Sequence, residues 1–368
     1  MDTSIPVIVL TGFLGAGKTT LLNRLLADPA MANAAVIINE FGDVPLDHLL
    51  VESSKDGIIA LSSGCICCSL RGDLADTLER LLLRMEGGAD PSLTAIVIET
   101  SGLADPVPVM QTVIGHPALR RHLSLRLVAT MIDSVNGLAT LADHRVAQIQ
   151  VAVADRLFVS KTDLTAGVVP TALARRIRGL NPRTAAATEP ENFIAALLEI
   201  AAPAGSAQAR SLIMNSVCHD GGPEHESGGE SSSGPMHPAS ISTFTLRRPE
   251  AIDRVALDAF LDLLASVHGP ALLRVKGLVK VMEHPDQPLL VHGVQRVFHP
   301  PRLLAGWPDG DTMSRIVFIT KGLEEGLIKR LFAGFLGIPD IDTPDRAALI
   351  DNPLAIAGFS PQPGKGRE

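Results

Sequence analysis

The chain has 368 residues, of which 46% are hydrophobic and 3% aromatic, and it carries a formal net charge of -8. This length exceeds what one compact core usually takes, so we expect two domains with aliphatic interiors. The negative charge argues against a nucleic-acid surface, and the lack of an apolar run of ~18 residues or of a basic N-terminus argues against a membrane span or secretory signal, so we expect a cytoplasmic protein.

The first motif is a phosphate-binding loop. Residues 7–11 are typical of a buried strand, since residues 7–10 are aliphatic, and leucines at helical spacing follow the loop. In a loop of this spacing, backbone N–H groups wrap the α and β phosphates, Lys18 reaches the β and γ oxygens, and the Thr19 hydroxyl ligates Mg²⁺. A glycine-rich turn that binds nothing is the alternative. The predicted nucleotide contacts are Gly12, Gly15, Ala16, Gly17, Lys18, Thr19 and Thr20.

Residues 35–38 predict a second strand, and an acidic loop over residues 39–47 follows it. Open α/β sheets place ligands at the carboxyl ends of their strands, which is where this loop lies. Glu40 and Asp43 are therefore candidate metal ligands. The alternative is that these carboxylates are simply solvated, and we would prefer it if no cysteines lay nearby in the sequence.

Three of the four cysteines, Cys65, Cys67 and Cys68, lie within four residues, after a short strand over 57–61 and before a helix that begins near Leu70. Such crowding does not fit a disulfide framework. A helix N-terminus favours the thiolate, which is the metal-binding form. Three thiolates leave a tetrahedral Zn²⁺ site incomplete, so a water, a nucleotide-dependent carboxylate or a partner's side chain would be the fourth ligand. Small buried hydrophobes are the alternative interpretation of these cysteines.

Another buried strand, over residues 93–98, leads to Glu99-Thr100-Ser101-Gly102. In nucleotide switches, an acidic residue at this position faces Mg²⁺ or the attacking water, and a glycine N–H contacts the γ-phosphate. Glu99, Gly102 and Lys18 are therefore the predicted catalytic set. A further strand over 125–133 and a single helix over 141–154 are expected next.

The strand over residues 156–159 leads into Ser160-Lys161-Thr162-Asp163. A carboxylate at Asp163 can accept both N1–H and N2–H₂ of guanine, a donor pair that adenine lacks, and Lys161 would lie against the base. The usual first residue of this motif is Asn, so Ser160 leaves the strength of the preference for GTP over ATP open. A strand-end lysine without a ligand role is the alternative.

The segment from about 202 to 240 is rich in Gly, Ser and Pro and predicts a flexible linker. It contains Cys218, His219, His225 and His237. We interpret these four as incidental residues of a linker in preference to a metal-collecting arm. Beyond it we expect a smaller α+β unit with strands over 241–246, 272–281, 289–298 and 315–320 and helices over 252–264 and 323–335. His268, His292 and His299 in this unit are interpreted as surface or satisfied polar residues.

Together these residues resemble the CobW-type GTPase metallochaperones, a family that delivers zinc or cobalt inside cells and includes nitrile hydratase activator-like members. The resemblance is strong over residues 6–163 and weaker over 272–277. Three departures stand out: Ile38 and Asp43 replace acidic-loop glutamates, Ser160 replaces Asn, and the linker lacks a dense histidine run. The motifs that carry the resemblance, in order, are Gly12 to Thr20, Asn39 to Asp43, Gly64 to Cys68, Glu99 to Gly102 and Ser160 to Asp163.

The resemblance implies an α/β fold: a P-loop NTPase domain with a mostly parallel sheet flanked by helices, followed by a smaller α+β C-terminal domain. We expect a GTPase domain with the CxCC metal site over residues 1–202, a linker over 203–240, a CobW-like C-terminal domain over 241–350 and a tail over 351–368.

The predicted function is hydrolysis of the β-γ phosphoanhydride of GTP, coupled to delivery of a divalent metal to a client protein. GTP and Mg²⁺ are the expected cofactors, with Zn²⁺, or Co²⁺ as the alternative, as the metal. A metal-sensing regulatory module with negligible turnover and a P-loop small-molecule kinase are the competing functions, and the kinase leaves the cysteines unexplained. The client, the metal used in the cell and the oligomeric state, including a homodimer, stay open.

Overall fold

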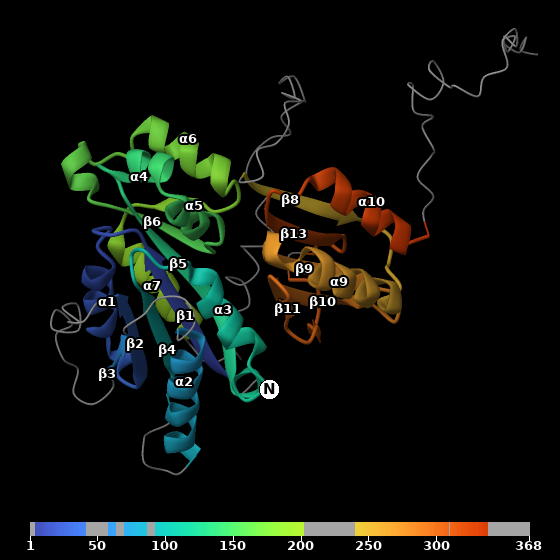
Figure 1. Ribbon diagram of the computed structural model, residues 1–368, viewed down its shortest axis with the longest axis horizontal. Coiled ribbons are helices and arrows are strands. Elements are labelled where there is room, and N and C mark those ends of the chain that lie inside the picture. Colours follow the sequence, from blue (N-terminus) through green and yellow to red (C-terminus); the bar gives the residue numbers. More distant parts are fainter. Residues whose placement is uncertain are drawn as a thin grey trace, which may run out of the picture.

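The computed structural model describes residues 4–41, 58–63, 70–86, 93–201, 240–308 and 310–337. Two β-sheets organise these residues, one of seven strands in the N-terminal unit and one of six strands in the C-terminal unit. Figure 1 shows the two units side by side, each with helices packed on its sheet. Within these ranges, no helix is both long and apolar enough to cross a membrane.

The N-terminal sheet is parallel throughout, with the spatial order β3-β2-β4-β1-β5-β6-β7. Its central strands are buried apolar runs, as expected when helices cover both faces. Because β1 lies between β4 and β5, the loop that follows β1 emerges near the middle of the carboxyl edge. The strands are β1 (Ile5–Gly12), β2 (Ala34–Phe41), β3 (Ile58–Ser63), β4 (Ala95–Thr100), β5 (Leu123–Asp133), β6 (Arg156–Ser160) and β7 (Ala186–Ala187).

The helices of this unit pack on opposite faces of the sheet because side chains along each strand alternate between the faces. Val7 and Val9 of β1 join a core with α2 and α3, whereas Ile8 and Leu10 join a second core with α1 and α7. The helices are α1 (Lys18–Leu26), α2 (Leu70–Glu86), α3 (Pro106–Gly115), α4 (Gly137–Asp143), α5 (Arg145–Ala152), α6 (Thr171–Leu180) and α7 (Pro190–Ala201). Short 3₁₀ turns, η1 (Pro29–Met31), η3 (Leu119–Arg121) and η4 (Thr162–Thr165), lie between them.

The single helix expected over residues 141–154 was wrong, because the chain forms two helices, α4 and α5. His144 separates them with an extended backbone, and its ring stacks on Phe13 at a centroid distance of 4.5 Å. Leu141, Ala147 and Val151 nevertheless share one core. Their common burial explains why the apolar pattern continues through the break.

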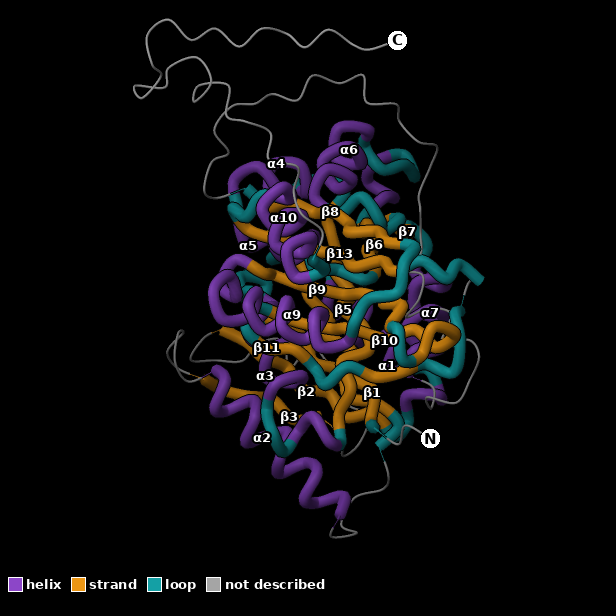
Figure 2. The backbone as a smooth tube through the Cα atoms, turned by 90° about the vertical axis from the view of Figure 1, so that its right-hand side faces the viewer, coloured by secondary structure: helices purple, strands orange, loops and turns teal. Residues whose placement is uncertain are grey.

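The C-terminal sheet is antiparallel, with the order β11-β10-β9-β13-β8 and β12 beside β10. Helices α9 and α10 cover its outer face, in front of the strands in Figure 2. Phe260 of α9 packs against Phe318 and Phe332 in this core. The elements are β8 (Ile241–Arg248), α9 (Arg254–His268), η5 (Gly269–Ala271), β9 (Leu272–Val281), β10 (His284–Val294), β11 (Val297–Phe298), β12 (Arg302–Leu303), β13 (Ser314–Lys321) and α10 (Glu325–Phe335).

The continuous strand expected over residues 289–298 was also wrong. The chain reverses at Gln295, whose φ is 51°, and β11 then pairs antiparallel with the end of β10. No glycine, asparagine or proline marks this turn, so the run of apolar residues concealed it.

The inner face of the C-terminal sheet packs against the N-terminal unit. Leu273, Val294 and Ile319 belong to the same buried core as Val109 and Val113 of α3. The contact also carries polar bonds: Gln111 Nε2 of α3 donates to Gln295 Oε1 at 2.8 Å. The two units therefore share one apolar core.

A buried ion cluster lies at the same boundary. Asp155 Oδ2 accepts a hydrogen bond from Arg274 at 2.8 Å, and Asp155 Oδ1 accepts one from Lys276 Nζ at 2.5 Å. Burial alone would raise the pKa of Asp155, but the two cations outweigh burial and hold the pKa well below its usual range. Asp155 thus joins the start of β6 to strand β9.

Candidate nucleotide and metal site

The loop between β1 and α1 takes its shape from its glycines. Gly12 has a φ of 142°, and a Cβ there would lie 2.4 Å from the carbonyl oxygen of Met131. Gly17, with a φ of 89°, precedes the first residue of α1. Both conformations strain any residue with a side chain. The helix N-terminus therefore faces the loop, which suits an anion.

Lys18 is buried and bends back over this loop. Its Nζ donates to the Gly12 carbonyl at 3.0 Å and lies 3.4 Å from the Phe13 carbonyl. The other predicted contacts differ in exposure: Ala16 is buried, whereas Gly15 and Thr20 are exposed. The ammonium group is thus held against the loop by backbone carbonyl oxygens.

Thr19 and Glu99 meet across the sheet. The Thr19 hydroxyl donates to Glu99 Oε1 at 3.2 Å, and Glu99 is 2% exposed at the end of β4. The strand order brings these residues together, since β4 pairs with β1. Both side chains offer hard oxygen donors, which fits Mg²⁺.

Gly102 lies directly against the phosphate-binding loop. A Cβ at Gly102 would lie 2.6 Å from the backbone N of Leu14, so only glycine allows this approach. Gln150 Nε2 donates to the Gly102 carbonyl at 3.3 Å and to the Ala104 carbonyl at 3.0 Å. Asp105 then caps α3 by accepting the N–H of Val107 at 2.9 Å. The segment after β4 is thus attached both to the loop and to α3.

The motif after β6 is held to the loop by Ser160. The Ser160 hydroxyl lies 2.8 Å from the Ala16 carbonyl oxygen and 3.2 Å from the Ile132 carbonyl oxygen. Lys161 follows with a left-handed backbone, φ 59°. Asp163 lies in η4 with an exposed side chain at the same edge of the sheet. Ser160 therefore connects the motif to the phosphate-binding loop through a backbone carbonyl.

Sequence reasoning missed Asp133, the last residue of β5. Its Oδ2 accepts a hydrogen bond from Lys161 Nζ at 2.6 Å, and its Oδ1 accepts the N–H of Val135 at 2.7 Å. Burial would raise the pKa of Asp133, but the bonds from Lys161, Asn136 and Val135 outweigh burial and lower it. The signal was an acidic residue at the end of the strand that neighbours β6.

The predicted metal ligands lie mostly outside the described residues. This holds for Cys65, Cys67, Cys68 and Asp43 and for the linker residues Cys218, His219, His225 and His237, while Glu40 is described only as part of β2. Among the described side chains, no three His, Cys, Asp or Glu residues gather closely enough to hold a metal ion.

The described strands nevertheless give the starting points of the two predicted metal-binding segments. Strands β2 and β3 are parallel and in register, with Phe41 opposite Ser63 at their carboxyl ends. The first residues of the acidic loop predicted over 39–47, including Glu40, thus belong to β2, and the rest of that loop follows Phe41. The cysteine segment follows Ser63. On the other side, β2 pairs with β4, where Ile38 lies opposite Glu99.

The sheet is parallel, and a glycine loop joins its first strand to a helix that starts with a lysine and a threonine. An acidic residue lies at the end of a neighbouring strand. These features define a P-loop NTPase. The chain belongs to the CobW/HypB/UreG family: the nucleotide-binding domain of that family matches residues 6–187. The cobalamin synthesis protein cobW C-terminal domain matches residues 241–336. The expected family and fold class are both confirmed.

The names of several similar proteins refer to zinc. The zinc chaperone YjiA of Escherichia coli is 31% identical over 335 residues, which are 90% of this chain and 98% of that protein. The zinc-regulated GTPase metalloprotein activator 1 of Schizosaccharomyces pombe is 36% identical over 184 residues, which are 48% of this chain and 44% of that protein. The zinc chaperone CobW of Sinorhizobium is 40% identical over 136 residues, 35% of this chain and 37% of that protein.

A solved structure of similar architecture is the Zn(II)-bound YjiA GTPase from E. coli. It superposes with a TM-score of 0.59 and 28% sequence identity, covering 90% of this chain and 99% of that one. The similarity therefore includes both units rather than the nucleotide-binding domain alone.

Proposed function

We propose that this protein is a cytoplasmic GTPase metallochaperone that carries a divalent metal, zinc, on Cys65, Cys67 and Cys68 and passes it to a client protein when GTP is hydrolysed. Glu40 or Asp43 adds a ligand when GTP orders the acidic segment. Residues 1–202 form the GTPase unit in this proposal, and residues 241–350 form the C-terminal domain.

The described side chains support hydrolysis of the β-γ bond of GTP. Lys18 neutralises charge on the β and γ oxygens, and the N–H of Gly102 contacts the γ-phosphate. Glu99 orients the attacking water, whose bond to the γ-phosphorus forms as the bond to the β-γ bridging oxygen breaks. Thr19 would hold Mg²⁺, which supplies neutralising charge to the phosphates. Turnover without a client is expected to be slow, on the order of 10⁻⁴ to 10⁻² per second.

The guanine preference rests on Asp163, which accepts two hydrogen bonds from the base, and on Lys161, which lies against the base. The bond from Lys161 to Asp133 orients the lysine before the nucleotide binds. Ser160 supports the same segment through its contact with the Ala16 carbonyl. These contacts support the proposal that Ser160, Lys161 and Asp163 act together in binding the guanine base.

The observation that carries the proposal is the pairing of β2 with β3. The part of the acidic loop that follows β2 and the cysteine segment extend from neighbouring strand ends, Phe41 and Ser63, and Glu40 lies in β2 beside them. The next strand, β4, carries Glu99 at the same edge. A γ-phosphate with Mg²⁺ can order such a segment, and hydrolysis releases it. The names of the relatives, which include zinc chaperones and a zinc-regulated GTPase, support zinc as the cargo.

The test is a competition titration of Zn²⁺ against a chromophoric chelator, with GDP and with a non-hydrolysable GTP analogue. We expect the analogue to tighten zinc binding by ~5- to 150-fold, and zinc to tighten binding of the analogue by the same factor. Changing Cys67 and Cys68 together to serine should abolish tight zinc binding and leave GDP affinity nearly unchanged.

The matched control is Cys218→Ser, which removes a thiol from the predicted linker and should leave zinc affinity unchanged. Equal zinc affinities in the two nucleotide states would refute nucleotide-gated delivery. Turnover that a zinc-accepting client does not raise would instead favour the metal-sensing regulatory module.

A further inference from the structure

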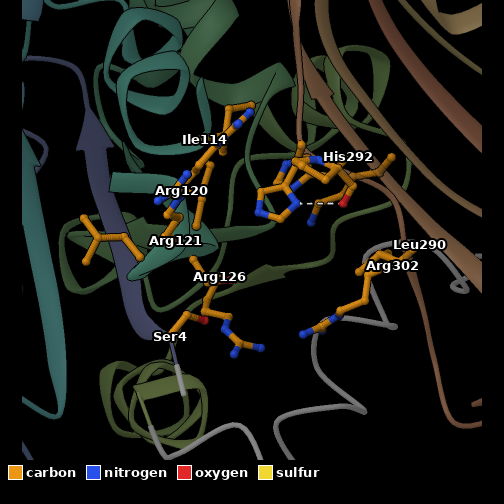
Figure 3. A pocket seen from close by; sticks show the side chains of 14 residues that line it. Ser4, Ile114, Arg120, Arg121, Arg126, Leu290, His292 and Arg302 are labelled. Atoms are coloured by element: carbon orange, nitrogen blue, oxygen red, sulfur yellow. Dashed lines mark hydrogen bonds between the residues drawn. The ribbon is translucent and has the colours of Figure 1, made fainter. Parts of the chain in front are cut away.

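A cavity of ≈ 180 Å³ lies between the two units. Its N-terminal side is formed by Arg120 and Arg121 of η3 and by Arg126 of β5, and its C-terminal side includes Lys276, His292 and Arg302. Figure 3 shows the three N-terminal arginines on one side of the opening and His292 and Arg302 on the other. The guanidinium groups of Arg126 and Arg302 point toward each other.

This cavity is separate from the nucleotide site. It is lined by the first residues of β5, including Leu125 and Arg126, whereas Asp133 at the other end of β5 faces the guanine motif. Eight residues of extended strand span roughly 25 Å. A nucleotide on the phosphate-binding loop cannot reach the cavity.

The charge of the lining is one-sided. Five lining residues are arginine or lysine, and no aspartate or glutamate occurs among the described residues that line the cavity. The whole chain, in contrast, has a net charge of -8. Cations gathered around one space repel each other, and the repulsion is stronger where water is partly excluded. A bound anion would meet cationic groups on both sides of the cavity.

Two of the cations are buried, since Arg126 and Lys276 are each 9% exposed. Burial and the neighbouring Arg274 lower the pKa of Lys276 to about 8, so the ammonium group stays mostly protonated at neutral pH. Asp155 is bonded to Lys276 from the side of the ion cluster. The charge of the lysine is therefore retained beside the cavity.

His292 adds an uncharged hydrogen-bonding group. Its Nε2 is buried and has no hydrogen-bond partner among the described atoms. Burial and the nearby Arg274 and Lys276 hold the pKa of His292 well below its usual range, so the ring is neutral at neutral pH. A buried polar atom without a partner is costly, and an oxygen-rich ligand would relieve that cost.

We propose that this interdomain cavity binds a small phosphate-bearing anion, held from one side by Arg120, Arg121 and Arg126 and from the other by His292 and Arg302. Arginine forks match the paired oxygens of a phosphate group. Ile114 and Leu290 supply apolar wall for a short organic part. The ligand bridges the two units, and its site is independent of the proposed GTPase activity.

The experiment is calorimetric titration of the full chain with inorganic phosphate and, in a parallel arm, with glycerol 3-phosphate. A non-hydrolysable GTP analogue with Mg²⁺ saturates the nucleotide site, and sodium chloride keeps the ionic strength constant. The test variant carries Arg121→Gln and Arg302→Gln, which are exposed residues on opposite sides of the cavity. The matched control carries Arg175→Gln and Arg178→Gln on α6, which remove the same charge from an exposed helix face.

Phosphate should bind the wild type and the α6 control with equal affinity, and at least ~tenfold more weakly to the Arg121/Arg302 variant. It should also raise the melting temperature of the wild type more than that of this variant, whose own melting temperature without phosphate reports that it is folded. Tighter binding of glycerol 3-phosphate than of inorganic phosphate identifies an organic phosphate as the ligand, and the reverse order identifies the free ion.

The proposal is overturned if the wild type shows no binding at tens of millimolar phosphate, or if both double variants bind equally. It is also overturned if a single-stranded oligonucleotide binds through the same two arginines more tightly than either small anion, since the site would then be a nucleic-acid surface.

Discussion

At the scale of single residues, Ser160 shows how a short side chain can support a recognition segment. The resemblance predicts an asparagine at this position, and the serine present here reaches the carbonyl of Ala16 in the phosphate-binding loop. Lys161 is held in turn by Asp133 at the end of the neighbouring strand. In the proposed function, guanine selection therefore depends on Asp163, which lies in η4 with an exposed side chain.

Replacing Asp163 by alanine should weaken GTP binding by about tenfold or more. The N1–H and N2–H₂ donors of guanine would lose their acceptor, at a cost of ~1–3 kcal/mol. ATP binding should be unchanged, because adenine has no such donor pair. Fluorescence titration with labelled GTP and ATP measures both affinities.

The control for this substitution is Asp143→Ala, which removes an exposed carboxylate at the end of α4. Equal affinity of the wild-type protein for ATP and GTP, or an equal loss of GTP affinity in the two variants, would show that Asp163 does not select guanine.

At the scale of elements, the segment between β4 and α3 joins the nucleotide loop to the second sheet. Gly102 approaches Leu14 at one end, and Gln111 of α3 is bonded to Gln295 at the other. Gln111 lies nine positions after Gly102 in the sequence, and Val113 of the shared core lies eleven positions after it. A displacement of Gly102 would therefore be carried through one short stretch of chain to α3, which packs against the C-terminal unit.

The variant Gly102→Ala should bind nucleotide more weakly and hydrolyse GTP more slowly. Its Cβ would lie 2.6 Å from the Leu14 backbone N, so either the loop or the segment must move. The matched control is Gly179→Ala in α6, where a Cβ meets nothing within 4 Å. Single-turnover hydrolysis and equilibrium binding separate the two effects. Wild-type rates in Gly102→Ala would contradict the tight approach.

Elements differed in how well the sequence predicted them. The strand over 272–281 was predicted to the residue, because a buried run flanked by a helix leaves one interpretation. Helix α3 was not predicted, because two prolines close together, Pro106 and Pro108, are typical of a loop. Both lie in the first turn of the helix, where proline is tolerated. The break at His144 coincides with stacking of its ring on Phe13, more than a hundred residues away in the sequence.

The residues of the candidate site also differed in how well the sequence predicted them. The phosphate-binding loop and Glu99 could be placed from local spacing, and the strand pairing brings Thr19 and Glu99 into contact. Asp133 and the interdomain arginines could not be found in this way. Their positions depend on which strands are neighbours and on how the two sheets face each other, and no local pattern records this.

At the scale of the whole molecule, the cluster of Asp155, Arg274 and Lys276 joins the two units through buried charge. Replacing Asp155 by asparagine leaves both cations buried without their carboxylate, so the free energy of unfolding should fall by about 3–5 kcal/mol. Urea denaturation at neutral pH measures this. The control is Asp258→Asn, which opens an exposed pair with Arg254 and should cost less than about 1 kcal/mol.

The same cluster predicts the pH dependence of stability. Folding lowers the pKa of Asp155 below its ordinary value of 3.8, so the unfolded chain binds a proton at a pH where the folded protein does not. The stability that Asp155 contributes is complete above about pH 5 and is lost as the pH falls toward the folded pKa. Wild-type protein should therefore lose more stability on acidification than Asp155→Asn. Parallel losses would show that another carboxylate controls acid unfolding.

The shared apolar core has a consequence for any attempt to divide the chain. A fragment that ends at Ala201 would present Val109, Val113 and Ile114 to water, because their partners Leu273, Val294 and Ile319 lie on the missing sheet. Such a face favours self-association over a stable isolated GTPase. The intact chain should melt as one cooperative calorimetric transition, and the two halves, expressed as separate polypeptides, should recover solubility only when they are produced together.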